Sequence, residues 1–103
     1  MNVIETNKEK LIQLCEAYKV NELYMFGSIL TDNFSETSDI DLLISFSKVE
    51  LLEYFDNYMD FKEELEKLLH RQIDLVEDQA IKNPIFRRVV DREKQLIYER
   101  KSD

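Results

Sequence analysis

Two aspartates that alternate with apolar residues are the first candidates for chemistry in this sequence. Asp39 and Asp41 flank Ile40 and precede an apolar run at 42–44. Residues two apart in a strand point to the same face, so both carboxylates would stand side by side. They would repel each other unless a cation lay between them, and magnesium is the oxygen-seeking cation that bridges nucleotide phosphates. Taken alone, the pattern is more typical of an edge strand whose acidic residues discourage aggregation.

A third aspartate, Asp74, interrupts a second apolar run at 73–76. A carboxylate in such a run costs stability unless it is solvated, paired or bound to a metal. If this segment is a strand beside that of Asp39 and Asp41, the three carboxylates form a cluster. Such a cluster could hold two metal ions, one to activate an attacking hydroxyl and one to grip a triphosphate.

Gly27 and Ser28 form a candidate phosphate-binding turn. Gly27 is the only glycine of the chain, and it follows a short apolar segment at 22–26. Glycine lets backbone amides approach a phosphate closely or turn sharply, and the Ser28 hydroxyl can donate to a phosphate oxygen. Taken alone, this dipeptide is more typical of an ordinary turn with a capping serine.

Helices and strands must position these residues, and the spacing of apolar side chains predicts their order. That order is helix, strand, strand, helix, strand, helix, strand, with one domain and one core over 1–103. We therefore expect an α+β fold, a small mixed sheet with helices packed on one face. The predicted helices are 7–19, a long one that starts after 47 and ends near 69, and one from 84; the predicted strands are 22–26, 40–46, 73–77 and 96–99.

Capping signals and apolar stripes add detail to the helices. A Thr-x-x-Glu pair at 6–9 and a Ser-x-x-Glu pair at 47–50 have the spacing of capping boxes. Asn83 followed by proline predicts the start of the last helix. Lys62 interrupts the stripe of the long helix, which allows a bend or break there. The expected inner faces are Leu51, Leu52, Phe55, Tyr58, Met59, Leu65, Leu68 and Leu69 in the long helix, and Ile85, Phe86, Val89 and Val90 in the last one.

Charge and cysteine content narrow the classes of function. With 14 basic and 22 acidic residues the net charge is −8, which suits a metal–carboxylate site or a basic partner and disfavours nucleic-acid binding. Cys15 is the only cysteine, so we expect neither an internal disulfide nor a cysteine zinc site, and its place on an apolar stripe predicts a buried hydrophobe. Neither a signal peptide nor a membrane span is predicted, so a cytoplasmic location is expected.

The motifs together resemble a known family. Phe-Gly-Ser at 26–28, followed by Ser-Asp-Ile-Asp-Leu-Leu-Ile at 38–44, is similar to the signature of the DNA polymerase β-like nucleotidyltransferases, and Asp74 matches their third carboxylate. The resemblance covers nearly the whole chain and is closest to the minimal nucleotidyltransferases. These small proteins are often paired with a HEPN-domain partner in bacterial and archaeal toxin–antitoxin modules.

The resemblance implies a reaction and a role for each position. Gly27 and Ser28 would bind the β and γ phosphates of ATP, and Asp39 and Asp41 would hold magnesium, with two ions in all. Asp74 would ligate the catalytic ion and help to activate the acceptor hydroxyl. AMP would pass to a tyrosine of the HEPN toxin, pyrophosphate would leave, and the toxin would be silenced.

Two departures from the family pattern leave alternatives open. At 30–32 the chain has Leu-Thr-Asp where relatives usually have a small residue, arginine and glycine, and His70 stands where they often have glycine. His70 is therefore expected to end the long helix in a left-handed conformation. The changed segment favours a second hypothesis, a weak or inactive antitoxin that neutralises its toxin by stoichiometric binding. Transfer to a small molecule such as an aminoglycoside is less favoured, because no second domain forms an acceptor pocket.

Overall fold

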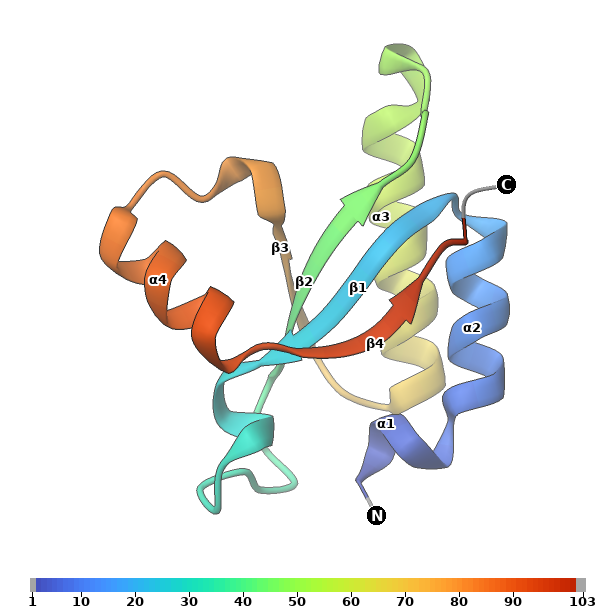
Figure 1. Ribbon diagram of the computed structural model, residues 1–103. Coiled ribbons are helices and arrows are strands. Elements are labelled where there is room, and N and C mark those ends of the chain that lie inside the picture. The colour runs from blue at the N-terminus through green and yellow to red at the C-terminus, as the bar shows by residue number, and fades with distance from the viewer. Residues whose placement is uncertain (1, 102–103) are drawn as a thin grey trace.

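A computed structural model describes residues 2–101 (Figure 1). Every predicted helix and strand is present in the predicted order, and the α+β class with a mixed sheet is confirmed. A short first helix and two 3-10 turns are added to the expected elements. The helices are α1 (Val3–Thr6), α2 (Lys8–Ala17), α3 (Leu51–Leu69) and α4 (Pro84–Glu93); the strands are β1 (Val20–Phe26), β2 (Ile40–Phe46), β3 (Ile73–Glu77) and β4 (Gln95–Glu99); the 3-10 turns are η1 (Gly27–Leu30) and η2 (Asp78–Ala80).

The four strands lie in the order β3-β2-β1-β4. Strand β1 is antiparallel to both β2 and β4, whereas β2 and β3 are parallel and are joined across the sheet by α3. Helices α2 and α3 cover one face of this sheet (Figure 1). Helix α4 packs on the opposite face through a small cluster of Phe26, Leu43 and Val90, so the prediction that the helices pack on one face is wrong for α4. The strand alternation thus gives β2 two apolar faces, with Ile40, Leu42 and Ile44 turned towards α3.

The fully buried side chains of α3 lie in its second half, and Tyr58 is a partly buried contact of the first half with the core. Phe61 and Leu65 are fully buried, and the helix runs without a break through Lys62. In the first half the inner-face prediction is confirmed for Tyr58, which packs against the core, and is wrong for four residues: Leu51, Leu52, Phe55 and Met59 are exposed by 87%, 95%, 70% and 40%. Figure 1 shows the reason, because the N-terminal turns of α3 extend beyond the sheet that would cover them.

Within residues 2–101, no helix has the length and apolar surface needed to cross a membrane.

Helix α4 is held by fewer side chains than its stripe predicts. Val90 is buried and Val89 half-buried, as expected. Ile85 and Phe86 are 70% and 40% exposed, so that part of the prediction is wrong. The first turn of α4 lies at the rim of the small cluster, where Phe86 touches Phe26 edge to face at a centroid distance of 6.1 Å.

The two capping boxes are absent because other groups engage the residues involved. Thr6 ends α1 and its hydroxyl donates to the Asn2 carbonyl at 3.1 Å. The Ser47 hydroxyl donates to the Lys19 carbonyl at 2.9 Å, and α3 begins after Glu50 with no side-chain cap.

Two other helix-end predictions are confirmed. The Asn83 side chain accepts hydrogen bonds from the amides of Ile85 and Phe86, at 2.8 and 3.1 Å. His70 ends α3 in the left-handed conformation with φ 55°, and its amide donates to the Glu66 carbonyl. This turn brings the chain from α3 into β3.

Cys15 is fully buried in α2, as its sequence position predicts. Burial raises the pKa of its thiol to about 12, so at pH 8 the thiolate is only about one part in 10⁴. We expect the native protein to react with a maleimide roughly 10³-fold more slowly than a free thiol, whose pKa is about 8.5. Mass spectrometry of timed samples would measure the rate, and denatured protein is the control. Fast native labelling would contradict the burial of Cys15.

Candidate active site

The parallel pairing of β2 and β3 places two of the predicted carboxylates side by side. Asp41 and Asp74 are register partners in these strands, and neighbouring strands lie about 4.8 Å apart. Partners in register present their side chains on the same face of the sheet. Asp41 is half-buried and Asp74 is exposed. Asp39 is exposed at the end of the loop that leads into β2, two residues before Asp41.

The antiparallel pairing of β1 and β2 brings the Gly-Ser turn to the same place. Phe26 is the register partner of Asp41, so Gly27 and Ser28 follow directly beside that carboxylate. Gly27 has φ 76°, and a β-carbon there would lie 2.3 Å from Oδ2 of Asp41. Only glycine combines this left-handed backbone with so close an approach. The backbone amide of Ser28 donates a hydrogen bond to the Asp41 carboxylate.

Electrostatics at Asp41 reflect this crowding. Burial raises the pKa of its carboxyl, and the negative charges of Asp74 and Asp39 raise it further. The hydrogen bond from the Ser28 amide acts in the opposite direction and is outweighed. A carboxylate whose ionisation is disfavoured in this way is stabilised by any nearby cation. A bound cation would therefore stabilise the ionised form of Asp41, and none of the described groups that shift its pKa is positively charged.

The donor set suits a divalent cation. Asp39, Asp41 and Asp74 offer only carboxylate oxygens, which are the ligands that magnesium prefers. Across residues 2–101, no three acidic, histidine or cysteine side chains are gathered tightly enough to make a ready-made metal cage. A metal would thus be held jointly by these carboxylates and by groups that a nucleotide brings, as magnesium usually is at triphosphates.

A groove on the surface of the described residues lies away from these site residues. It has a volume of about 510 Å³ and runs between α2 and α3, on the face of the sheet opposite to α4. None of the predicted site residues lines it, so the chemistry does not depend on that groove. It is lined by Lys10, Gln13, Leu14, Ala17, Glu64, Lys67 and Leu68.

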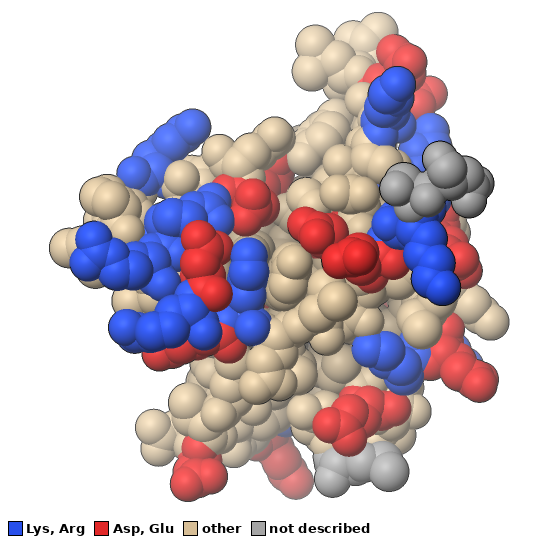
Figure 2. Space-filling view, in the orientation of Figure 1, with Lys and Arg blue, Asp and Glu red and all other residues tan. Residues whose placement is uncertain are grey.

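A basic surface lies on α4, on the same side of the sheet as Asp41. Figure 2 shows lysine and arginine side chains gathered there, with acidic side chains among them. Arg87 bonds to Asp78 at 2.8 Å and to Asp91 at 3.2 Å, and Arg92 pairs with Glu93. Much of this positive charge is therefore already neutralised within the protein.

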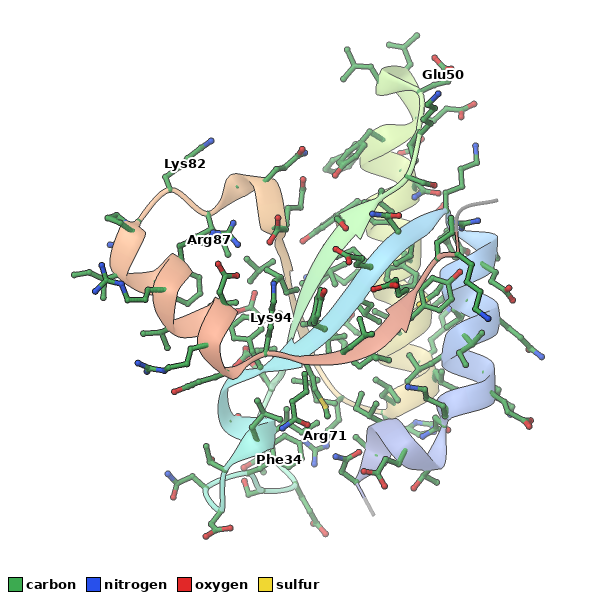
Figure 3. All side chains as sticks on the ribbon, in the orientation of Figure 1. Phe34, Glu50, Arg71, Lys82, Arg87 and Lys94 are labelled. Carbon is green, nitrogen blue, oxygen red and sulfur yellow. The ribbon has the colours of Figure 1, made fainter. Side chains whose placement is uncertain are left out.

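Sequence patterns did not single out Arg71, although its guanidinium reaches the loop that precedes Asp39 (Figure 3). The contact joins residues far apart in the chain, so no local spacing marks it. The only local signal was a cation just after the end of the long helix and directly before the strand of Asp74.

A glycine-serine turn that faces paired carboxylates on adjacent strands defines a nucleotidyltransferase type of site. Residues 9–103 match the family described as "Polymerase beta, Nucleotidyltransferase", and the chain belongs to that family. Protein adenylyltransferase MntA of Thermococcus cleftensis is 31% identical over 86 residues, which cover 84% of this chain and 81% of that protein. MJ1379 of Methanocaldococcus jannaschii, named as a candidate protein adenylyltransferase, is 34% identical over 85 residues, 82% of each chain.

Solved structures share the fold. A candidate minimal nucleotidyltransferase superposes with a TM-score of 0.74 at 28% identity, over 92% of this chain and 95% of that one. A toxin–antitoxin structure with AMP-PNP gives a TM-score of 0.68 at 19% identity, over 92% and 75%. A tri-AMPylated Shewanella oneidensis HEPN toxin in complex with MNT antitoxin gives 0.63 at 18%, over 93% and 72%. The last two likenesses concern the fold alone.

Proposed function

We propose that this protein is a magnesium-dependent protein adenylyltransferase that moves AMP from ATP to a tyrosine hydroxyl of a HEPN-domain toxin and so acts as an antitoxin. The observation that carries the proposal is the meeting of Asp41, Asp74 and the Gly27-Ser28 turn at one end of the sheet. Relatives above 30% identity whose names are those of protein adenylyltransferases support the choice of AMP and of a protein acceptor.

Gly27 and Ser28 hold the β and γ phosphates in this proposal. The absence of a side chain at Gly27 makes room for the Asp41 carboxylate directly beside the turn, and the Ser28 hydroxyl donates to a phosphate oxygen. The Ser28 amide, which donates to Asp41 in the free protein, is available to the nucleotide once the carboxylate turns to a cation. Binding thus exchanges one hydrogen bond for another and relieves the crowding at Asp41.

The reaction is an in-line displacement at the α-phosphorus. The tyrosine oxygen forms a bond to that phosphorus, the bond to the bridging oxygen of pyrophosphate breaks, and pyrophosphate departs with its electron pair. The proton of the hydroxyl passes to the exposed carboxylate of Asp74. Asp39, Asp41 and Asp74 would hold two magnesium ions, which when bound neutralise the triphosphate and activate the hydroxyl. Positioning and charge neutralisation supply most of the rate.

The choice of partner rests on analogy and charge. Toxin–antitoxin complexes share this fold, and one of them contains an AMPylated HEPN toxin. The net charge of −8 suits association with a more basic protein. We place the protein in the cytoplasm, where ATP and such a partner are available.

A second candidate function is neutralisation of the toxin by binding alone. Asp32, which replaces the usual glycine after the Gly-Ser turn, is exposed and adds negative charge to the loop beside the proposed triphosphate. The usual arginine is also missing at position 31, so the loop lacks a positive charge that could attract the triphosphate. Weak nucleotide binding would leave a stoichiometric antitoxin that keeps the fold.

A transfer assay separates the two candidates. The purified protein is mixed with magnesium, α-labelled ATP and its cognate HEPN partner, beside a variant with Asp39→Ala and Asp41→Ala. If the protein is a transferase, label appears on a tyrosine of the partner with wild type and not with the variant. Chelation of magnesium then abolishes the labelling. A tight complex without label in either sample would refute the transferase and support the binding antitoxin. Label on the partner's Ser or Thr residues would correct the acceptor alone.

A further inference from the structure

Arg71 holds the loop before Asp39 at two points. Its guanidinium carbon lies 4.6 Å from the centre of the Phe34 ring, a cation–π contact. Its Nη1 donates to the Ser38 carbonyl at 2.6 Å. Figure 3 shows Arg71 and Phe34 close together beneath the sheet, where the turn after α3 meets the loop before β2. The two contacts therefore fix both the beginning and the end of the 34–38 segment.

The second contact of Arg71 is with Ser38, the residue directly before Asp39. On the other side of Asp39, the Ile40 amide donates to the Gln72 carbonyl at 3.0 Å. Arg71 and Gln72 are neighbours in the turn between α3 and β3, so this one turn grips the chain on both sides of Asp39. The orientation of the Asp39 carboxylate thus depends on the position of Arg71.

Other restraints on this loop are local and weak. The Ser35 amide donates to the Ser38 hydroxyl at 3.0 Å, and Thr37 and Glu36 are exposed. Within the described part of the chain, the Asp39 side chain makes no hydrogen bond or ion pair that would hold it. Phe34 alone anchors the loop to the main core, through its partly buried ring. Without the guanidinium above it, that ring has no link to Ser38.

We propose that Arg71 is a positioning residue for Asp39, resting on the proposed function of the site. Its guanidinium ties Phe34 to Ser38 and so presents the Asp39 carboxylate beside Asp41 for a metal-bound nucleotide. The family's usual arginine at position 31 is absent here, and Arg71 gives the same loop a guanidinium contact from a different element. Arg71 itself touches neither Asp39 nor Asp41.

Arginine suits this task better than lysine. Its planar guanidinium stacks on a ring and donates in its own plane at the same time, whereas a lysine ammonium is a point charge with no plane. Lysine at position 71 can keep the bond to Ser38 or the contact with Phe34, and it holds both less well. A graded response to substitution follows from this difference.

The test compares Arg71→Ala and Arg71→Lys with wild type, and uses Arg92→Ala as a matched control on the surface of α4. The affinity for Mn²⁺ is measured by electron paramagnetic resonance with saturating AMP-PNP, and AMP transfer is measured against magnesium concentration. Residues that orient metal ligands typically contribute 10- to 100-fold to metal affinity or activity. We expect Arg71→Ala to weaken Mn²⁺ binding by about 10- to 100-fold. Arg71→Lys should fall between this and wild type, and Arg92→Ala should match wild type.

The two readouts separate the proposal from a general loss of structure and from the proposed function. Thermal melting should show that Arg71→Ala remains folded, and a high magnesium concentration should restore much of its transfer rate. Wild-type Mn²⁺ affinity in Arg71→Ala overturns the positioning role. If wild type transfers no AMP, the proposed function fails, and the Mn²⁺ measurement still decides whether Arg71 sets the geometry of Asp39.

Discussion

Replacement of Asp41 by asparagine is expected to reduce AMP transfer by at least about 10³-fold, which corresponds to about 4 kcal/mol of lost transition-state stabilisation. Asp41 is the central carboxylate, since Asp74 is its register partner on β3 and the Gly-Ser turn after β1 lies beside it. Asparagine keeps the shape and can still accept the hydrogen bond from the Ser28 amide. Because asparagine carries no negative charge, it does not hold a divalent cation as aspartate does. The negative charge of the triphosphate is then no longer neutralised.

The same substitution is expected to stabilise the free protein at neutral pH. The folded pKa of Asp41 is raised, so the folded state binds more protons than the unfolded state between the two pKa values. Stability therefore falls as pH rises from the usual value of about 3.9 through the folded pKa, and it stays lower above that pH. Asp41→Asn removes this loss, and its advantage should shrink towards zero at the acidic end.

Thermal melting between pH 3.5 and 8, with and without magnesium, measures the stability, and the label transfer assay measures the rate. Asp56→Asn is the control, because Asp56 is an exposed residue of α3 and its replacement changes the net charge equally. Magnesium with AMP-PNP should raise the melting temperature of wild type and of Asp56→Asn and leave Asp41→Asn unchanged. An Asp41→Asn protein that melts earlier than wild type at pH 7, or that keeps its transfer rate, would contradict this account of the site.

Replacement of Gly27 by alanine is expected to lower both stability and transfer. A residue held in a sparsely populated conformation costs about 1–3 kcal/mol, and the contact with Oδ2 of Asp41 at 2.3 Å makes a cost of at least the middle of that range the expected one. A loss of about 2 kcal/mol lowers the melting temperature of a domain of this size by roughly 8–16 °C. Asp41 must also move away from the turn, so transfer should fall by at least about 10²-fold, as in other sites when a reacting group is displaced by about 1 Å.

A double-mutant cycle identifies the cause. Asp41→Ala removes Oδ2 and Cγ, the two atoms nearest to the new methyl group, and leaves only a contact at 3.4 Å. Gly27→Ala should therefore cost clearly less stability in the Asp41→Ala background than in wild type, and the residual cost measures the left-handed backbone alone. Equal costs in both backgrounds would show that Asp41 is not the obstacle.

The strands and the candidate site could be predicted because their signals are local. The apolar segments at 40–46 and 73–77 predicted both β2 and β3, and the two-residue spacing of Asp39 and Asp41 predicted that these two carboxylates share a face. The resemblance to a family then connected these segments with Gly27 and Ser28. The register that makes Asp41 the partner of Asp74 joins distant residues, and the sequence-based argument could only state it as a condition.

The errors arose where local signals compete with distant partners. The apolar stripe of α3 marks the side of the helix that would be buried, but it carries no information on how far the sheet extends, so Leu51 and Phe55 were misplaced. Ser47 has the right spacing for a cap and bonds instead to Lys19, which lies on another element. Arg71 was missed for the same reason. Its two partners lie in the 34–38 loop, which is separated from Arg71 in the sequence by β2 and α3.

The parallel pairing of β2 with β3 has a consequence for the order in which the protein becomes competent during folding. The antiparallel pair β1–β2 can close early, and it already contains the Gly-Ser turn and Asp41. Asp74 joins them only after the chain has formed α3 and crossed the sheet, a closure that costs more entropy. Strand β3 is also a five-residue edge strand, the kind of element that opens first in local unfolding. An incomplete or partly opened chain therefore keeps the Gly-Ser turn with Asp39 and Asp41 and lacks Asp74 beside them, so under the proposed function we expect no AMP transfer before β3 has joined the sheet.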